Sequence, residues 1–179
     1  MQEWKKKKAL IKGVKYSTVF EPIEREVLGD LAASVSEAII ARVQSAPKDE
    51  LADMMGMASG HKDAPEDPSL ARLFPDFQRE GDEEFDGDAQ LLRSLHENDI
   101  ARAKLMNLQL IGEVLGPNGS VNVTLDEEEA ASFVAGLNDL RLFLAASEMP
   151  QGEGPMADRD ALVEWLAYNQ DSLLTAMMD

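Results

Sequence analysis

Apolar residues recur every three to four positions in several long segments, and this spacing constrains the fold more than any other feature of the sequence. The first run begins behind Pro22, which suits the first turn of a helix because its missing N–H costs nothing there. The spacing predicts an amphipathic helix over residues 22–46, ended by Pro47. The residues at four-residue spacing are Leu31, Val35, Ile39 and Val43.

Further helices are expected along the rest of the chain. A helix over residues 88–115 is apolar on nearly all sides in its second half, so residues 100–115 are predicted to be the buried centre of the fold. Two capping boxes, one of Thr124 with Glu127 and one of Asp126 with Glu129, compete to open a helix that runs to about Ser147. Shorter helical segments are predicted over residues 48–57 and 70–74, and a last helix begins near residue 158.

Strands are expected in only two places. Residues 9–20 are rich in β-branched and aromatic types, which indicates either a hairpin around Lys12–Gly13 or one strand with a bulge. Residues 121–125 alternate like a short strand. The predicted fold class is mainly α (α+β), a domain of four to five helices with a small two- to three-stranded sheet. Residues 1–179 are expected to form a single domain, with a flexible acidic insertion at about residues 60–90.

The charge of the chain is divided unevenly. Six lysines against Glu3 give residues 1–15 a balance of +5, and since the whole chain carries −17, the remainder carries −22. So acidic a body repels phosphate backbones, which makes nucleic acid an unfavourable partner except through the N-terminal lysines. The candidate basic arm consists of Lys5, Lys6, Lys7 and Lys8. The alternative interpretation of these lysines is a solvated surface.

Several kinds of chemistry lack their required residues. The chain has no cysteine, which removes disulfides and thiolate metal sites, and with only two histidines a zinc site has little to build on. An EF-hand alignment of the acidic segment 82–93 places Arg93 where the bidentate glutamate belongs. A nucleophile elbow at residues 56–60 has Ala58 in place of serine. We therefore expect no cofactor, no metal and no catalytic residue. With no signal peptide or membrane span visible, we expect a cytoplasmic protein.

Polar residues among the apolar positions of the helices are the remaining candidates for a site. If these helices pack together, some of the charges must be buried, and buried charges need partners. The structural interpretation is a satisfied network between helices, and the functional alternative is a polar groove for a ligand or peptide. The candidates are Asp99, Arg102, Asn138, Asp139 and Arg141.

Three longer strings resemble a known family. They are Asp67-Pro-Ser-Leu-Ala-Arg-Leu-Phe-Pro-Asp76, Leu137-Asn-Asp-Leu-Arg-Leu142 and Glu164-Trp-Leu-Ala-Tyr-Asn-Gln-Asp-Ser-Leu173. Together with the basic start around Trp4, they resemble an actinobacterial domain-of-unknown-function family, numbered two-thousand-and-seventeen. The likeness covers nearly the whole chain and brings no established enzymatic activity with it. Because genes of this family are often found near that of the Clp protease adaptor, the resemblance implies a link to proteolysis or stress regulation.

Three functional hypotheses follow. The first is a non-enzymatic regulatory or adaptor-type protein that acts through contacts with another protein of unknown identity. The second is a transcription-associated regulator that uses its basic N-terminus. The third is an enzyme with a site between helices, which predicts a deep pocket at Asp99 or Arg141. The apolar content is also compatible with a homodimer.

Overall fold

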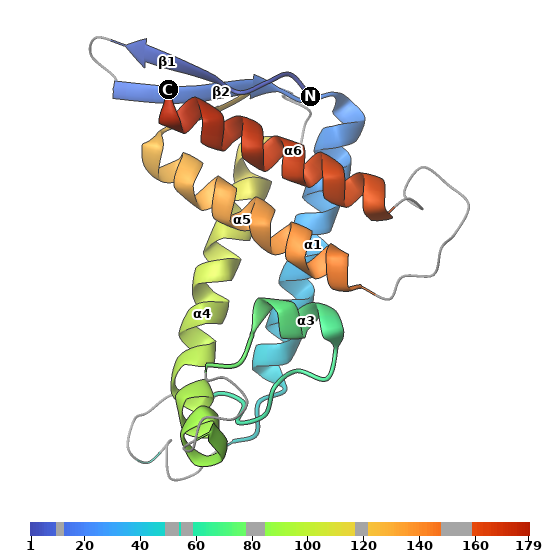
Figure 1. Ribbon diagram of the computed structural model, residues 1–179, viewed down its shortest axis with the longest axis vertical. Coiled ribbons are helices and arrows are strands. Elements are labelled where there is room, and N and C mark those ends of the chain that lie inside the picture. Colours follow the sequence, from blue (N-terminus) through green and yellow to red (C-terminus); the bar gives the residue numbers. More distant parts are fainter. Residues whose placement is uncertain (10–12, 49–53, 55–58, 78–84, 117–121, 148–158) are drawn as a thin grey trace.

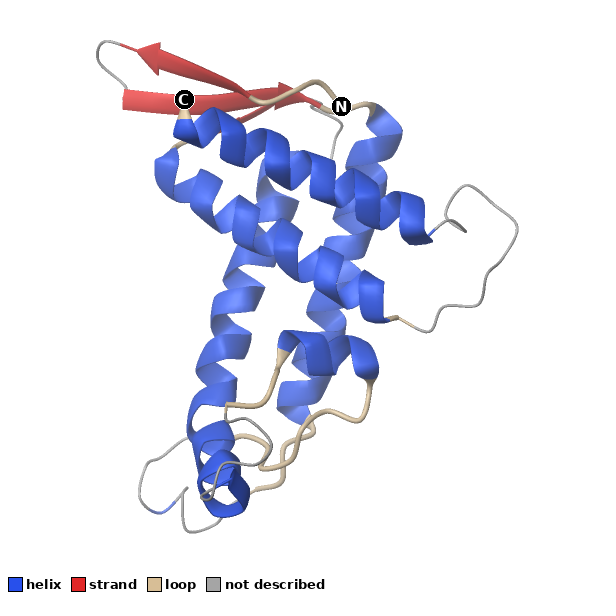
Figure 2. Ribbon diagram, in the orientation of Figure 1, coloured by secondary structure: helices blue, strands red, loops and turns tan. Residues whose placement is uncertain are grey.

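The computed structural model describes residues 1–9, 13–48, 54, 59–77, 85–116, 122–147 and 159–179. The described elements are β1 (Lys5–Ala9), β2 (Gly13–Val19), α1 (Pro22–Gln44), α3 (Pro68–Leu73), α4 (Phe85–Leu115), β3 (Asn122–Leu125), α5 (Glu127–Ala146) and α6 (Arg159–Met178). A small sheet lies at one end of the molecule, α5 and α6 cross beneath it, and α1 and α4 extend away from it (Figures 1 and 2). The predicted fold class, a mainly helical α+β domain with a small sheet, is confirmed.

Helix boundaries follow the local signals in the sequence closely. Pro22 is the first residue of α1, and Glu21 and Glu24 form a capping box around it. At α5, Asp126 is the N-cap and accepts hydrogen bonds from the backbone N–H groups of Glu128 (3.1 Å) and Glu129 (2.9 Å). Of the two capping boxes considered from the sequence, the structure therefore forms the one of Asp126 with Glu129.

The core lies between α1, α4 and the α5–α6 pair. Helices α5 and α6 run antiparallel and pack against the sheet, whereas α1 and α4 pack side by side (Figure 1). The largest fully buried side chains are Phe20, Phe74, Phe133, Leu28, Ile39, Leu73, Leu108, Ile111, Leu125, Leu137, Leu140 and Leu166. None of the described helices is long and apolar enough to cross a membrane.

The prediction that residues 100–115 are buried on all sides is wrong. Leu108 and Ile111 are buried as expected, but Met106 is 65% exposed and Gln109 is exposed beside it. The reason is that α4 is covered by α1 on one side and by α5 on another. Its remaining side faces solvent and carries a methionine that the sequence pattern assigned to the core.

The three strands form an antiparallel sheet in the order β1-β2-β3. Of the two alternatives that the sequence left open, a hairpin and a single bulged strand, the structure has the antiparallel pair β1–β2, with Gly13 at a positive φ of 72° where β2 begins. Its first strand starts further towards the N-terminus than expected, so that Lys5–Lys8 lie within β1. Register partners in an antiparallel sheet point to the same face. The pairs Lys5↔Ser17 and Lys7↔Lys15 therefore place these four side chains on one face of the sheet.

An aromatic cluster joins the sheet to the helices. Trp4 is 5% exposed and lies edge-on to Phe133, with ring centroids 5.5 Å apart. Its indole N–H donates to Asn169 Oδ1 at 2.8 Å, and its backbone N–H donates to Ser172 Oγ at 2.9 Å. The residue before β1 is thereby tied to α6, at the other end of the chain.

The second tryptophan lies in the same cluster. Trp165 of α6 packs edge-on to Phe20, with centroids 6.3 Å apart, and its indole N–H donates to Glu24 at 3.1 Å. Burial raises the pKa of Glu24, but hydrogen bonds from the chain's amino terminus, the Glu21 backbone and Trp165 outweigh it, so the pKa is lowered. The carboxylate of Glu24 thus holds α1 against α6.

Two parts of the sequence interpretation fall on residues outside the described ranges. The short helix expected over 48–57 lies almost entirely there, as does part of the acidic insertion expected at about 60–90. Of that insertion, residues 60–77 are described and include α3, where a helical turn was predicted, and residues 85–90 are described as the first turns of α4. The division into one domain with an insertion stays a prediction.

Gly136 lies where α5 packs tightly against α4. A Cβ atom at this position would lie 2.7 Å from Ile111 Cδ1 and 3.2 Å from the carbonyl oxygen of Asn107. Gly112, on α4, offers a matched control because a Cβ there would meet nothing within 4 Å. A helical Gly→Ala change is favourable by about 0.5–1 kcal/mol, whereas overpacking a core costs about 1–3 kcal/mol.

We therefore expect Gly112→Ala to stabilise the protein and Gly136→Ala to destabilise it. Urea unfolding followed by circular dichroism measures both, and the two variants should differ by more than about 1 kcal/mol in free energy of unfolding. Equal midpoints for the two variants would contradict the close helix contact.

Candidate functional site

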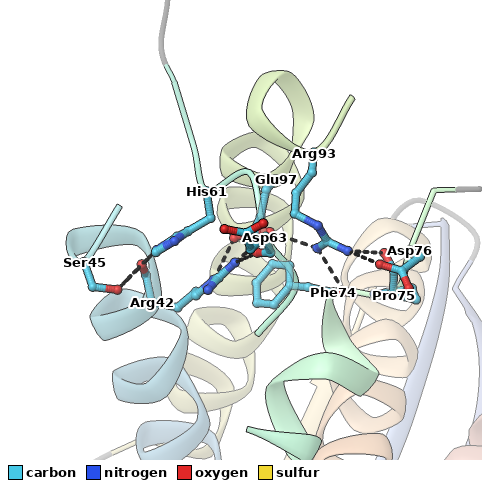
Figure 3. Close-up of polar contacts among 9 residues, drawn as sticks. All are labelled: Arg42, Ser45, His61, Asp63, Phe74, Pro75, Asp76, Arg93 and Glu97. Atoms are coloured by element: carbon cyan, nitrogen blue, oxygen red, sulfur yellow. Dashed lines mark hydrogen bonds and ion pairs between the residues drawn. The ribbon is translucent and has the colours of Figure 1, made fainter. Parts of the chain in front are cut away.

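A cluster of charged side chains centred on the buried Glu97 lies at the end of the helices away from the sheet (Figure 3). We call Arg42, Asp76, Arg93 and Glu97 the arginine cluster. The carboxylate of Glu97, only 2% exposed, accepts hydrogen bonds from Arg42 Nε at 2.9 Å and Arg93 Nη1 at 3.0 Å. Arg93 also donates to Asp76 Oδ1 at 2.6 Å. Two guanidinium groups and two carboxylates are therefore paired at a place where unpaired charges would be costly.

The same arginines hold the backbone of residues 59–77 across α1 and α4. Arg93 donates to the carbonyl oxygens of Phe74 (3.1 Å) and Pro75 (3.4 Å), and Arg42 donates to that of Asp63. His61 Nε2 lies 2.7 Å from the carbonyl oxygen of Arg42, near the end of α1. Figure 3 shows these groups converging from three segments of the chain. The arrangement fastens the segment to both helices.

The chemistry of the arginine cluster favours a structural role. Both oxygens of Glu97 already accept from guanidinium groups, at 2.9 to 3.4 Å, which leaves this carboxylate poorly placed to take a proton from a substrate. A small cavity of about 200 Å³ beside it is lined by Lys62, Asp63, Asp76, Phe77, Gln90 and Arg93 among others. The described residues contain no group of three or more His, Cys, Asp or Glu side chains that could hold a metal ion.

The sequence pattern does not predict this cluster. Arg93 stands out in the sequence only as the cation at the position of an EF-hand's bidentate glutamate, and no motif points to Glu97 or Arg42. A usable signal was present, because Arg93 and Glu97 are an opposite-charge pair at i and i+4 on one helix. What the sequence lacked was any indication that this pair is buried rather than exposed.

Removing the central charge of the cluster should be costly. Glu97→Gln leaves the largely buried guanidinium of Arg42 without its carboxylate and leaves Arg93 with Asp76 alone, and breaking a buried pair in this way costs about 3–5 kcal/mol. Asp99→Asn is the matched control, because Asp99 pairs with Arg102 at 3.5 Å at the surface, where both side chains are at least 70% exposed. An exposed pair contributes at most about 1 kcal/mol.

We expect the unfolding midpoint of Glu97→Gln to fall clearly and that of Asp99→Asn to stay near the wild-type value. Hydrogen exchange should locate the loss in residues 59–77. A Glu97→Gln protein as stable as wild type would mean that the cluster does not hold this segment.

The residues predicted from the sequence form separate pairs rather than one network. Asp99 pairs with Arg102 on α4, and Arg141 donates to Asn138 at 3.2 Å on α5. Asp139 is 5% exposed and accepts from Lys104 at 2.7 Å, a partner on α4 that the sequence did not suggest. The structure places them along two helices, with Asp139 buried and Asp99 and Arg102 in solvent.

Lys5–Lys8 lie in the sheet, whose two faces differ sharply. The inner face is buried against α5 and α6 and carries Trp4, Tyr16, Thr18, Val123 and Leu125. The opposite face is turned away from every described helix (Figure 1). We call it the basic sheet face; its residues are Lys5, Lys7, Lys15, Ser17 and Thr124. A hollow of about 460 Å³ lies over part of it, bordered by Lys5, Lys7, Ser17, Asn122 and Thr124 among others.

Two lysines of this face stand directly opposite one another. Lys7 and Lys15 are register partners across β1 and β2, and like charges in this position destabilise a sheet. Lys15 Nζ lies 3.4 Å from Asp126 Oδ2, the N-cap of α5, which offsets part of the repulsion. The hydrogen bond from the Glu129 backbone lowers the pKa of Asp126 most; the charge of Lys15 lowers it further, and the slight burial opposes both.

This lowered pKa gives a pH dependence with a definite sign. A carboxylate whose folded pKa is depressed stabilises the protein fully above its unfolded pKa, about 3.9, and loses that contribution as pH falls through the folded value. Asp126→Asn keeps a good N-cap but removes the charge. Thermal unfolding should show Asp126→Asn below wild type at pH 7, with the gap closing below about pH 4. A gap of equal size at both pH values would rule out the charge as its cause.

The fold and these two polar sites define a small helical protein whose described residues contain no metal-binding group. The family described as domain of unknown function (DUF2017) matches residues 1–177, and the chain belongs to this family. The resemblance found in the sequence is thereby confirmed. The implied link to the Clp protease adaptor is tested by none of these findings and stays a prediction.

Relatives with a named role cover nearly the whole chain. It is 32% identical over 183 residues to the oxidative stress regulator AosR of Mycobacterium tuberculosis and to that of Mycobacterium bovis. Each match spans 93% of this chain and 84% of the relative. The putative oxidative stress regulator AosR of Mycobacterium leprae is 31% identical over 196 residues, spanning 99% of this chain and 89% of the relative. No solved structure matches the chain.

Proposed function

We propose that this chain is a non-enzymatic regulator in the response to oxidative stress and that it acts by contacting another protein. The observation that carries the proposal is similarity to proteins named oxidative stress regulators along 93–99% of the chain. Similarity at about 32% identity over that length supports a shared fold and a shared general role.

The composition of the chain supports a role downstream of the step at which a thiol senses the oxidant. With no cysteine, this chain has no thiol that an oxidant could convert to a sulfenic acid or a disulfide. The oxidative signal therefore reaches it by another route, such as a partner that is itself oxidised. This chain then transmits the signal through a change in what it contacts.

The charge of the molecule supports a protein as the partner. Outside residues 1–15 the chain carries −22, and a body this acidic repels the phosphates of a long nucleic acid. The basic sheet face is the exception, with three lysines on a surface that no described helix covers.

The second candidate is a transcription-associated regulator whose lysines contact DNA or RNA polymerase. One observation favours it, namely that Lys5 and Lys7 are exposed on a firmly anchored strand. The two candidates differ in salt dependence, because release of counterions from DNA makes binding fall steeply as salt rises.

Deletion of the gene in the native host tests the proposal. We expect the deletion strain to lose viability in peroxide, and a copy of the full chain to restore it. Chemical crosslinking before and after peroxide should capture a protein whose recovery changes with the treatment. Normal survival of the deletion strain, with no crosslinked protein, would overturn the proposal.

A further inference from the structure

Within the part of the chain that the structure describes, β1 is an edge strand with one unpaired side. The strand order β1-β2-β3 places its only strand partner, β2, on one side, and no described element pairs with the other. An edge strand presents a row of backbone N–H and C=O groups with which an extended segment of another chain can pair. The edge is therefore equipped to bind a polypeptide through its backbone.

The side chains of this edge are unusually uniform. Lys5 and Lys7 point to the outer face, opposite Ser17 and Lys15, whereas Lys6 and Lys8 lie across from Tyr16 and Val14 on the other face. None of the four lysines forms an ion pair or hydrogen bond with another described side chain. A strand added to this edge would meet unpaired ammonium groups on both of its faces.

The opposition of Lys7 and Lys15 shows that this surface is not arranged for stability alone. Like charges directly across a strand pair weaken the sheet, and Asp126 reaches only Lys15, at 3.4 Å. A carboxylate placed beside Lys7 would remove the remaining repulsion. Sites that break a local rule of stability are where function is expected.

From these observations we propose that β1 binds an acidic, extended segment of a partner protein, which adds to the sheet as a further strand beside Lys5–Lys8. This inference rests on the proposed function and names the surface and the chemistry of the partner.

The strand is held ready for such a partner before it arrives. Trp4, immediately before β1, is buried against Phe133 and hydrogen-bonded to Asn169, while β2 pairs along the whole of β1. A partner therefore does not have to order this strand on binding, which lowers the entropic cost of association.

The same surface suits nucleic acid poorly. Single strands bind by stacking bases on aromatic side chains, and the basic sheet face carries none among its described residues. A duplex carries one negative charge per about 1.7 Å and would extend from the lysines over the acidic body. A short acidic segment would interact mainly with the lysines beside it and little with the acidic body, because screening limits charge interactions to about 8 Å at physiological salt.

The experiment measures binding of short fluorescent peptides to the full chain by anisotropy. The probe is a peptide in which Glu alternates with Thr, a residue that favours strands. One control peptide has Gln in place of Glu, which removes the charge. A second has the acidic sequence with alternate backbone nitrogens methylated, which keeps the charge but blocks strand pairing. A duplex DNA that carries the same fluorescent label tests whether the chain binds nucleic acid.

Variants separate the edge from the general charge of the protein. Lys5→Gln with Lys7→Gln changes the edge, and Lys48→Gln with Arg72→Gln removes the same charge from two exposed residues outside the sheet, one following α1 and one on α3. We expect the edge variant to weaken binding of the acidic peptide by about five-fold or more and the control variant to change it little. The Gln peptide and the methylated peptide should both bind more weakly than the acidic peptide.

Several results would overturn the inference. Equal binding of the methylated and unmethylated peptides would mean that no strand is added, and indifference to the edge variant would place any binding elsewhere. Absence of acidic-peptide binding would mean that the lysines only protect the edge from other strands. Tight binding of the duplex alone would make the partner a nucleic acid. If the peptide fails to bind while the deletion strain stays sensitive to peroxide, this surface is wrong and the regulatory function stands.

Discussion

Burial of Trp4 is the contact on which the arrangement of the rest depends. Its ring packs edge-on to Phe20 and Phe133, and its indole N–H donates to Oδ1 of Asn169 on α6, a residue with no exposure to solvent. Because Trp4 directly precedes β1, fixing this residue also fixes the strand of lysines that follows it. A run that could have been a loose cationic tail is thereby part of a sheet with a defined register.

The two polar features of the molecule use charge in opposite ways. In the arginine cluster, buried guanidinium groups are neutralised by Glu97 and Asp76, and the pairing fastens one segment of backbone to α1 and α4. On the sheet, Lys5–Lys8 find no described partner and stay at the surface. Paired charges hold this fold together, and unpaired charges mark where another molecule is expected.

Local signals in the sequence were sufficient for most of the fold, and tertiary contacts decided the rest. Pro22 begins a helix as predicted, and Asp126, one of the two N-caps that the sequence offered, begins another, because caps depend on neighbouring residues alone. Met106 was assigned to the core because apolar composition does not reveal how many sides of a helix are covered. The arginine cluster joins residues up to 55 positions apart, so spacing along the chain could not bring Arg42 to Glu97. The lysines were visible in the sequence, but their membership of an edge strand was not.

Both tryptophans of the chain lie in the aromatic cluster that joins the sheet to α6. Trp4 is the residue next to the lysine strand, and Trp165 is hydrogen-bonded to Glu24 at the start of α1. The tryptophan fluorescence of the protein therefore originates from this one junction. A movement of the sheet relative to the helices would alter the emission, whereas a change confined to the distant arginine cluster would be optically silent. The two tryptophans thus report spectroscopically on the end of the molecule where the sheet meets the helices.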